Sequence, residues 1–119
     1  MRPNGSMLTS GDVVDLDLGL PAGREAGFRH PVVVVTAQEI LDESANVIQV
    51  VPLTSRIREF GSEVRVTADA QNGLDADSSA QCQHVRSVST ERVETVKGNI
   101  GFAALTEIRR VLSLILDID

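Results

Sequence analysis

Three short segments of the sequence combine side chains that can bind a phosphate and move protons. They contain Arg29 with His30, Thr54 with Ser55, and His84 with Arg86. An arginine can donate two hydrogen bonds to one phosphate and stays charged, and an imidazole exchanges protons near neutral pH. A hydroxyl can orient a phosphate oxygen by hydrogen bonding. Taken singly, each segment is more typical of a solvated loop end, a turn or the solvent-exposed face of a strand. The functional interpretation therefore depends mainly on the order of the segments along the chain.

No familiar catalytic or metal-binding signature accompanies these segments. The sequence has no Gly-rich phosphate loop, no HExxH or CxxC motif and no nucleophile elbow. Two histidines and one cysteine are too few for a structural zinc site. We therefore expect chemistry without a metal or cofactor. The lone cysteine, Cys82, cannot form an internal disulfide.

The composition is that of one folded domain with an acidic charge balance. The chain has 119 residues, of which 42% are hydrophobic, and its net charge is −6 from 17 acidic and 11 basic side chains. This balance argues against a protein that coats nucleic acid passively. Basic side chains nevertheless gather at positions 24–30 and 56–58, which favours a small local site. No apolar run approaches the roughly 20 residues of a membrane span or resembles a secretory signal, so a cytoplasmic location is expected.

Residues 1–6 (MRPNGS) are typical of a cloning remnant, and a single domain is expected over residues 7–119. Polar, glycine-containing segments at 19–29, 56–62 and 69–77 are expected to be loops, the last with an Asn72-Gly73 turn. A short helix is expected over 37–44. Alternating or β-branched runs predict strands at 12–18, 32–35 (opened by Pro31), 47–53 and 63–67, one or two strands within 79–89, and an extended piece within 93–100 that Gly98 interrupts.

The clearest helix is expected at the C-terminus, where apolar residues recur every three or four positions. Its buried face is expected to comprise Leu105, Ile108, Leu112 and Ile115, widened by Ala104, Val111 and Leu114. Phe102, at the start of this helix, is expected in the core. Because turns rather than helices join most neighbouring strands, the sheet should be mainly antiparallel and curled around a small core. The expected class is mainly β with a C-terminal helix (α+β).

The order of these segments resembles that of a known family. DLDLG ends one strand, and HPVVVVT, VVPLTS and QHVRSVS follow before the amphipathic helix. This order is similar to that of the MazF/PemK toxins, the endoribonuclease half of bacterial type II toxin–antitoxin pairs, over nearly all of residues 11–116. The resemblance implies a small SH3-like antiparallel barrel of the CcdB/MazF/PemK type. It also implies a homodimer whose RNA groove spans both subunits and which a cognate antitoxin inhibits.

The resemblance assigns site residues only where the motifs match. The family's catalytic threonine maps to Thr54. Its catalytic arginine stands immediately before the proline of the Val-rich strand, where this chain has His30, with Arg29 one residue earlier. Either Arg29 serves that role or His30 takes its place. We expect Arg29 to stabilise charge and donate a proton, His30 to act as acid or base, and Thr54 to position the phosphate.

The implied reaction is metal-independent, sequence-specific cleavage of single-stranded RNA. The 2′-hydroxyl attacks the adjacent phosphorus and leaves a 2′,3′-cyclic phosphate and a 5′-hydroxyl. Bases of single-stranded RNA stack on aromatic rings, and Phe28 and Phe60 lie in or beside the two polar loops. Phe60 could instead anchor its loop on the core. The other residues expected to bind RNA are Arg24, Ser55, Arg56, Arg58, His84 and Arg86.

A different class of function stays open at this point. The gyrase poison CcdB has the same type of barrel and acts by binding a protein, so this chain could be a catalytically silent barrel or an antitoxin-binding module. The displacement of the arginine from position 30 to position 29 keeps that alternative open.

Overall fold

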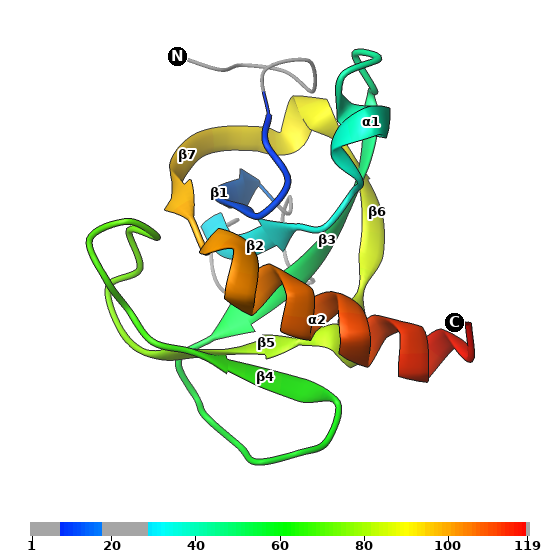
Figure 1. Cartoon of the computed structure of the whole chain (residues 1–119). Coiled ribbons are helices and arrows are strands. Elements are labelled where there is room, and N and C mark those ends of the chain that lie inside the picture. Colours follow the sequence, from blue (N-terminus) through cyan, green and yellow to red (C-terminus); the bar gives the residue numbers. More distant parts are fainter. Residues whose placement is uncertain (1–7, 18–28, 119) are drawn as a thin grey trace, which may run out of the picture.

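The computed structural model describes residues 8–17 and 29–118, with seven strands in one sheet and a long C-terminal helix (Figure 1). The strands are β1 (Asp12–Asp17), β2 (Arg29–Val34), β3 (Val47–Thr54), β4 (Glu63–Val66), β5 (Ser78–Gln81), β6 (Arg86–Ser89) and β7 (Val93–Asn99). The helices are α1 (Gln38–Leu41) and α2 (Gly101–Leu116), with single turns of 3₁₀ helix at η2 (Cys82–His84) and η3 (Thr90–Arg92).

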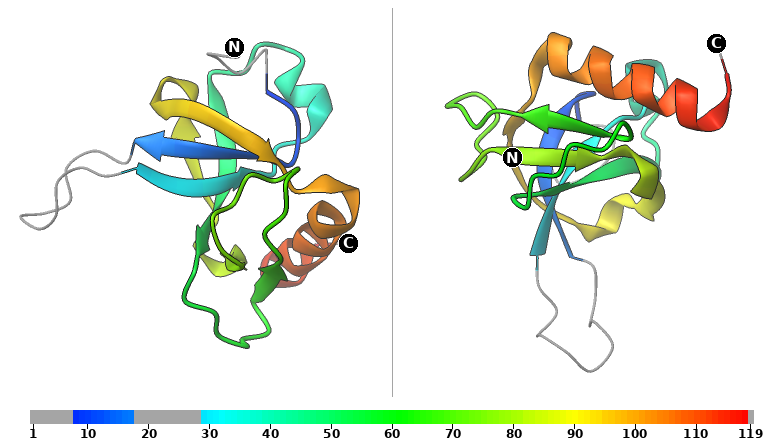
Figure 2. Two further views of the ribbon diagram at one scale, coloured as in Figure 1. Left: turned by 90° about the vertical axis from the view of Figure 1, so that its left-hand side faces the viewer. Right: turned by 90° about the horizontal axis from the view of Figure 1, so that it is seen from below.

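All strand pairings are antiparallel, and the sheet curls into an open barrel (Figure 2). The strand order is β4-β5-β3-β2-β1-β7, and β6 pairs with the first half of β3. Among the described strands, the hydrogen-bonded path ends at β4 and β7 without closing. The expected class, mainly antiparallel β with a C-terminal helix, is therefore confirmed.

The Val-rich strand β2 is buried on both faces, as its continuous β-branched run predicts. Val32 and Val34 point into the curled sheet, together with Ile48 and other apolar side chains. Val33 points the other way and packs in a second cluster with Ile108 of α2. One strand thus separates two small cores, which explains how a chain with few aromatics can still bury both sides of its sheet.

Two prolines mark the end of the β2–β3 ladder. The register between these strands runs from Val34↔Val50 to Val32↔Pro52. Proline has no N–H to donate to a ladder, so pairing is weakened at Pro31 and Pro52. Beyond Pro52, β3 pairs with β5 instead. The expectation that Pro31 opens the strand is wrong, because β2 already includes residues 29 and 30 through their pairing with β1.

Three further expectations about local structure are corrected. The helix expected over 37–44 is a single turn, α1. His84 and Arg86 do not share one strand face, because His84 ends η2 and Arg86 begins β6. Gly98 does not interrupt β7 but lies within it, where the absence of a Cβ lets another loop approach closely.

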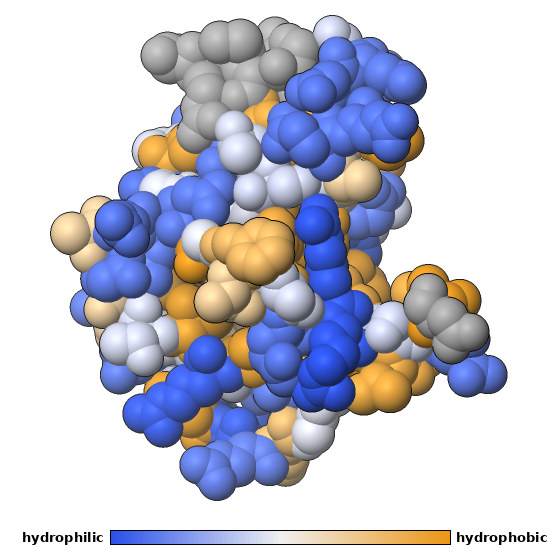
Figure 3. Space-filling model, viewed as in Figure 1, coloured by the Kyte–Doolittle hydropathy of each residue, from blue (hydrophilic) through white to orange (hydrophobic). Residues whose placement is uncertain are grey.

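The helix α2 covers one side of the sheet with only part of its apolar face. Leu105, Ile108 and Val111 are buried, whereas the last apolar side chains, Leu114 and Ile115, are exposed. These residues belong to the C-terminal turns, which extend beyond the strands and form an apolar surface (Figures 1 and 3).

The expectation that Phe102 belongs to the core is wrong. Its side chain is 84% exposed, because burial along α2 begins only at Leu105. In the described part of the chain, no helix is long and apolar enough to cross a membrane.

Candidate active site

A cavity of about 330 Å³ lies where β2 begins and β3 ends. Its polar lining comes from two of the segments singled out in the sequence and from two further parts of the chain. The polar residues are His30, Thr54, Ser55, Asp75, Ser78 and Lys97. Its volume is at the small end of the range of ligand pockets, which suits a single phosphodiester group with its sugar.

His30 is held at the wall of this cavity by both neighbouring strands. Its backbone pairs with Leu16 of β1, and its imidazole is hydrogen-bonded to the backbone of Leu53. Burial lowers the pKa of His30, and this effect outweighs the hydrogen bond to Leu53 and the nearby charge of Asp15, which both raise it. The imidazole is therefore neutral at pH 7 and able to accept a proton.

Thr54 is the last residue of β3, and its hydroxyl is oriented by the turn that follows. The backbone N–H of Arg56 donates a hydrogen bond to Thr54 Oγ1 at 3.1 Å. Because the hydroxyl oxygen accepts this bond, its own proton can be donated to another oxygen. His30, near the start of β2, and Thr54, at the end of β3, both line the cavity. The structure thus brings together two of the three residues expected to be catalytic.

Sequence reasoning missed a charged pair that also lines the cavity. Lys97 of β7 and Asp75 of the 69–77 loop line it, with Lys97 Nζ 3.7 Å from Asp75 Oδ2. The Lys97 side chain is only 21% exposed, whereas that of Asp75 is 97% exposed. The one available signal was that Lys97 is the single lysine of the chain. No local pattern could place it near Thr54, because the two residues are 43 positions apart in the sequence.

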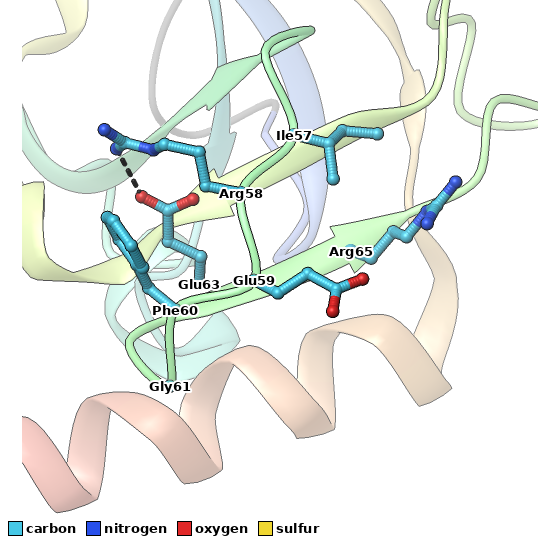
Figure 4. A pocket seen from close by; sticks show the side chains of 7 residues that line it. All are labelled: Ile57, Arg58, Glu59, Phe60, Gly61, Glu63 and Arg65. Carbon is cyan, nitrogen blue, oxygen red and sulfur yellow. Dashed lines mark hydrogen bonds and ion pairs between the residues drawn. The ribbon is translucent and has the colours of Figure 1, made fainter.

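A second pocket of about 280 Å³ lies beside the 56–62 loop (Figure 4). Arg58 forms an ion pair with Glu63 at 2.7 Å, and its guanidinium carbon lies 4.6 Å from the centre of the Phe60 ring. Phe60 is 53% exposed, so it does not anchor its loop on the core. An exposed ring stacked on a guanidinium is a surface on which a nucleic-acid base can stack.

Glu63 lines this second pocket and fixes the position of the Arg58 side chain. Burial opposes ionisation of Glu63, but hydrogen bonds from Gln83, Arg58 and Ser79 outweigh it and lower its pKa. The amide of Gln83 donates at 2.7 Å and the hydroxyl of Ser79 at 3.1 Å. Glu63 therefore stays charged at neutral pH and fixes the guanidinium of Arg58.

The remaining predicted site residues are spread over the surface or lie outside the described residues. The side chains of Arg56, His84 and Arg86 are exposed and do not line the cavity. Arg86 pairs with Val50, four positions before Thr54 on β3. Arg24, Phe28 and the side chain of Arg29 lie outside the described part, although the Arg29 backbone pairs with Asp17. Among the described residues, no three His, Cys, Asp or Glu side chains gather as metal ligands.

Comparison with known proteins gives the same fold and a family. A family model described as PemK-like, MazF-like toxin of type II toxin–antitoxin system matches residues 9–116. Endoribonuclease MazF9 of Mycobacterium tuberculosis is 31% identical over 116 residues, which cover 94% of this chain and 98% of that protein.

Two solved structures from Deinococcus radiodurans superpose over nearly the whole chain. A MazF crystal structure has a TM-score of 0.71 at 26% identity, covering 93% of this chain and 97% of that one. A MazE–MazF crystal structure has a TM-score of 0.73 at 25% identity, covering 94% and 98%. Because the family model and the 31% identical relative both extend over almost all of the sequence, this chain belongs to the PemK-like, MazF-like toxins of type II toxin–antitoxin systems.

Proposed function

We propose that the chain is a metal-independent, sequence-specific endoribonuclease that cleaves single-stranded RNA at the cavity between His30 and Thr54. The observation that carries this proposal is the placement of a neutral imidazole and an oriented hydroxyl on neighbouring strands of one phosphate-sized cavity. The matching relative from Mycobacterium tuberculosis is named an endoribonuclease, which supports the same reaction class.

The reaction needs one bond made and one bond broken at phosphorus. The 2′-oxygen of the substrate attacks the adjacent phosphorus, and the bond from phosphorus to the 5′-oxygen breaks. The 2′-hydroxyl proton passes to a base, and the leaving 5′-oxygen receives a proton. His30 is suited to accept the first proton because its lowered pKa keeps it neutral at pH 7. Thr54 donates a hydrogen bond to a phosphoryl oxygen and so fixes the phosphate for in-line attack.

Arg29 supplies the positive charge at the phosphate in this proposal. An arginine stays protonated and matches the geometry of phosphate oxygens, so it can stabilise the extra charge of the transition state and donate toward the 5′-oxygen. Arg29 precedes His30 at the start of β2, which places its backbone beside the cavity.

The second pocket extends this site toward substrate bases. We assign a neighbouring base to the Phe60 ring and phosphates to Arg56 and Arg58. The toxin acts in the cytoplasm as a homodimer held inactive by a cognate antitoxin; solved relatives include MazE–MazF complexes.

One experiment tests the proposed activity directly. The purified chain is incubated with a long transcript in the presence of EDTA, and the ends of the products are mapped. Discrete fragments with 2′,3′-cyclic phosphate and 5′-hydroxyl ends are expected. Inhibition of DNA supercoiling without any RNA cleavage would instead show a gyrase poison.

A further inference from the structure

We propose that Lys97 is a phosphate-binding residue of the cleavage site and that Asp75 holds its ammonium group while no RNA is bound. The proposal rests on the proposed RNA cleavage and adds a residue to it. Among the described residues that line the cavity, Lys97 carries the permanent positive charge. A phosphate that enters the cavity beside His30 and Thr54 would therefore meet this ammonium group, which lines the same cavity.

A β-bulge places Lys97 in the cavity wall. Val13 pairs with Gly98 and Val14 pairs with Val96, so Lys97 is the extra residue of β7 at this point. A bulge bends its strand and re-aims a side chain that regular pairing would direct elsewhere, and bulges are frequent beside active sites. The Lys97 side chain is only 21% exposed, and it lines the cavity with its ammonium group 3.7 Å from the Asp75 carboxylate.

The 69–77 loop is fixed against the same bulge by close backbone contacts. A Cβ on Gly73 would lie 2.3 Å from the Lys97 carbonyl oxygen, and one on Gly98 would lie 2.2 Å from the Gln71 carbonyl oxygen. The N–H of Asn99 donates to that Gln71 carbonyl at 2.9 Å. Side chains larger than glycine could not allow this approach, so the two glycines hold Asp75 and Lys97 in one fixed arrangement.

Within the loop, the side chain of one buried asparagine forms hydrogen bonds with backbone groups of the loop that a regular strand or helix would pair. Asn72 is 1% exposed, and its side-chain oxygen accepts hydrogen bonds from the N–H groups of Asp69 and Leu74. Its amide donates to the Thr67 carbonyl at 2.9 Å. Hydrogen bonds thus hold the loop as far as Leu74, the residue before Asp75, whose carboxylate is exposed.

The unequal exposure of the pair indicates which partner a phosphate would replace. The Asp75 carboxylate is almost fully exposed, and an exposed ion pair of this kind contributes little to stability. A phosphodiester can therefore replace Asp75 as the partner of the Lys97 ammonium group at a small free-energy cost, while the mostly covered Lys97 side chain stays in place. The Asp75 carboxylate thus pairs with the same ammonium group that the substrate phosphate would bind.

Kinetics of charge-removing variants test the role of Lys97. Lys97→Met keeps the aliphatic stem and should lower kcat/KM on a mapped RNA site by at least about tenfold, the scale of a lost charged hydrogen bond. The slope of log kcat/KM against log salt should also become shallower by about 0.7, the value for one phosphate contact on a single strand. Lys97→Arg should restore most of kcat/KM and most of its salt dependence. Arg110→Gln removes an equal charge from the exposed face of α2 and serves as the matched control.

The single lysine allows a direct binding measurement that needs no cleavage. Reductive methylation with ¹³C-formaldehyde labels only Lys97 and the N-terminal amine, which is the internal reference. Addition of a 2′-O-methyl oligoribonucleotide, which lacks the attacking hydroxyl, should shift the Lys97 resonance and leave the reference unchanged. An unshifted Lys97 resonance, or wild-type kinetics and salt dependence in Lys97→Met, would overturn the proposal. Absence of RNA cleavage by the wild-type chain would contradict the proposed function instead.

Asp75 is tested by coupling it to Lys97. Asp75→Asn frees the ammonium and should lower KM by a factor of about two to five, as expected from an exposed ion pair. In the Lys97→Met background the same change should have no effect on KM. An equal effect of Asp75→Asn in both backgrounds would overturn the role given to Asp75, because the carboxylate would then act independently of Lys97.

Discussion

His30 and Thr54 stand on the same face of neighbouring strands, and the hydrogen bond from His30 reaches the backbone of Leu53, the residue immediately before Thr54. The imidazole is therefore tied to the strand that carries the hydroxyl. This hydrogen bond connects the two groups that we propose to be catalytic, at the end of the β2–β3 ladder.

The first prediction concerns the hydroxyl of Thr54. Thr54→Ala should lower RNA cleavage by at least roughly tenfold, the scale of one lost transition-state hydrogen bond, because the phosphate loses a donor. Thr54→Ser keeps the oxygen that accepts from the Arg56 N–H and should retain most activity. Thermal unfolding of all three proteins checks that the fold is intact. Equal turnover in Thr54→Ala and wild type would remove Thr54 from the site.

The second prediction concerns the pH dependence of the rate. Burial lowers the pKa of His30 below its ordinary value of about 6.5. If the neutral imidazole is the base, the rate should fall on the acidic side, as pH decreases through this lowered pKa, and be level above it. This fall of the rate at acidic pH should be absent from the His30→Gln variant. The variant should also cleave RNA more slowly than the wild type at neutral pH. Identical pH–rate profiles of the two proteins would exclude His30 as acid or base.

The third prediction separates Arg29 from His30. Phosphoryl charge requires a permanent cation, which a neutral imidazole does not provide. Arg29→Ala should therefore abolish cleavage, Arg29→Lys should restore it in part, and His30→Ala should retain measurable activity. Single-turnover cleavage of one mapped RNA measures all three. If His30→Ala is inactive and Arg29→Ala is active, the histidine has taken the role of the family's catalytic arginine.

The fourth prediction concerns the exposed ring of the second pocket. Phe60→Leu removes a stacking surface worth about 1–3 kcal/mol per base and should raise KM more than it changes kcat. Phe102→Leu is the matched control, because Phe102 is an exposed phenylalanine on α2 that lines neither pocket. Equal KM values for the two variants would show that Phe60 does not contact RNA.

The fifth prediction concerns the contact between β7 and the 69–77 loop. Gly98→Ala places a Cβ 2.2 Å from the Gln71 carbonyl oxygen, so strand and loop must separate. We expect a loss of about 1–3 kcal/mol in the free energy of unfolding, as for other overpacked sites, measured by urea denaturation. Gly61→Ala is the control, since a Cβ there meets no atom within 4 Å. Unchanged stability in Gly98→Ala would show that the loop tolerates displacement.

Local patterns in the sequence were sufficient for most of the elements, and the resemblance to the toxin family singled out Thr54 and His30, which line one cavity. The β-branched run at 32–35 predicts a strand buried on both faces because period and side-chain shape are local properties. Phe102 and Ile115 show the limit of such patterns. An apolar residue at helical spacing is buried only where the rest of the fold covers it, and the strands cover only the middle of α2.

Only the tertiary structure shows which charged residues line the cavity beside His30 and Thr54. Lys97 enters it because β7 carries one extra residue against β1, and strand pairing between distant segments has no local signal. Asp75 enters it because two glycines let the 69–77 loop touch that bulge. The sequence by itself determined the family's order of segments, the antiparallel class and the threonine with its neighbouring imidazole. The positive charge that faces them depends on contacts between segments far apart in the chain, and only folding brings these together.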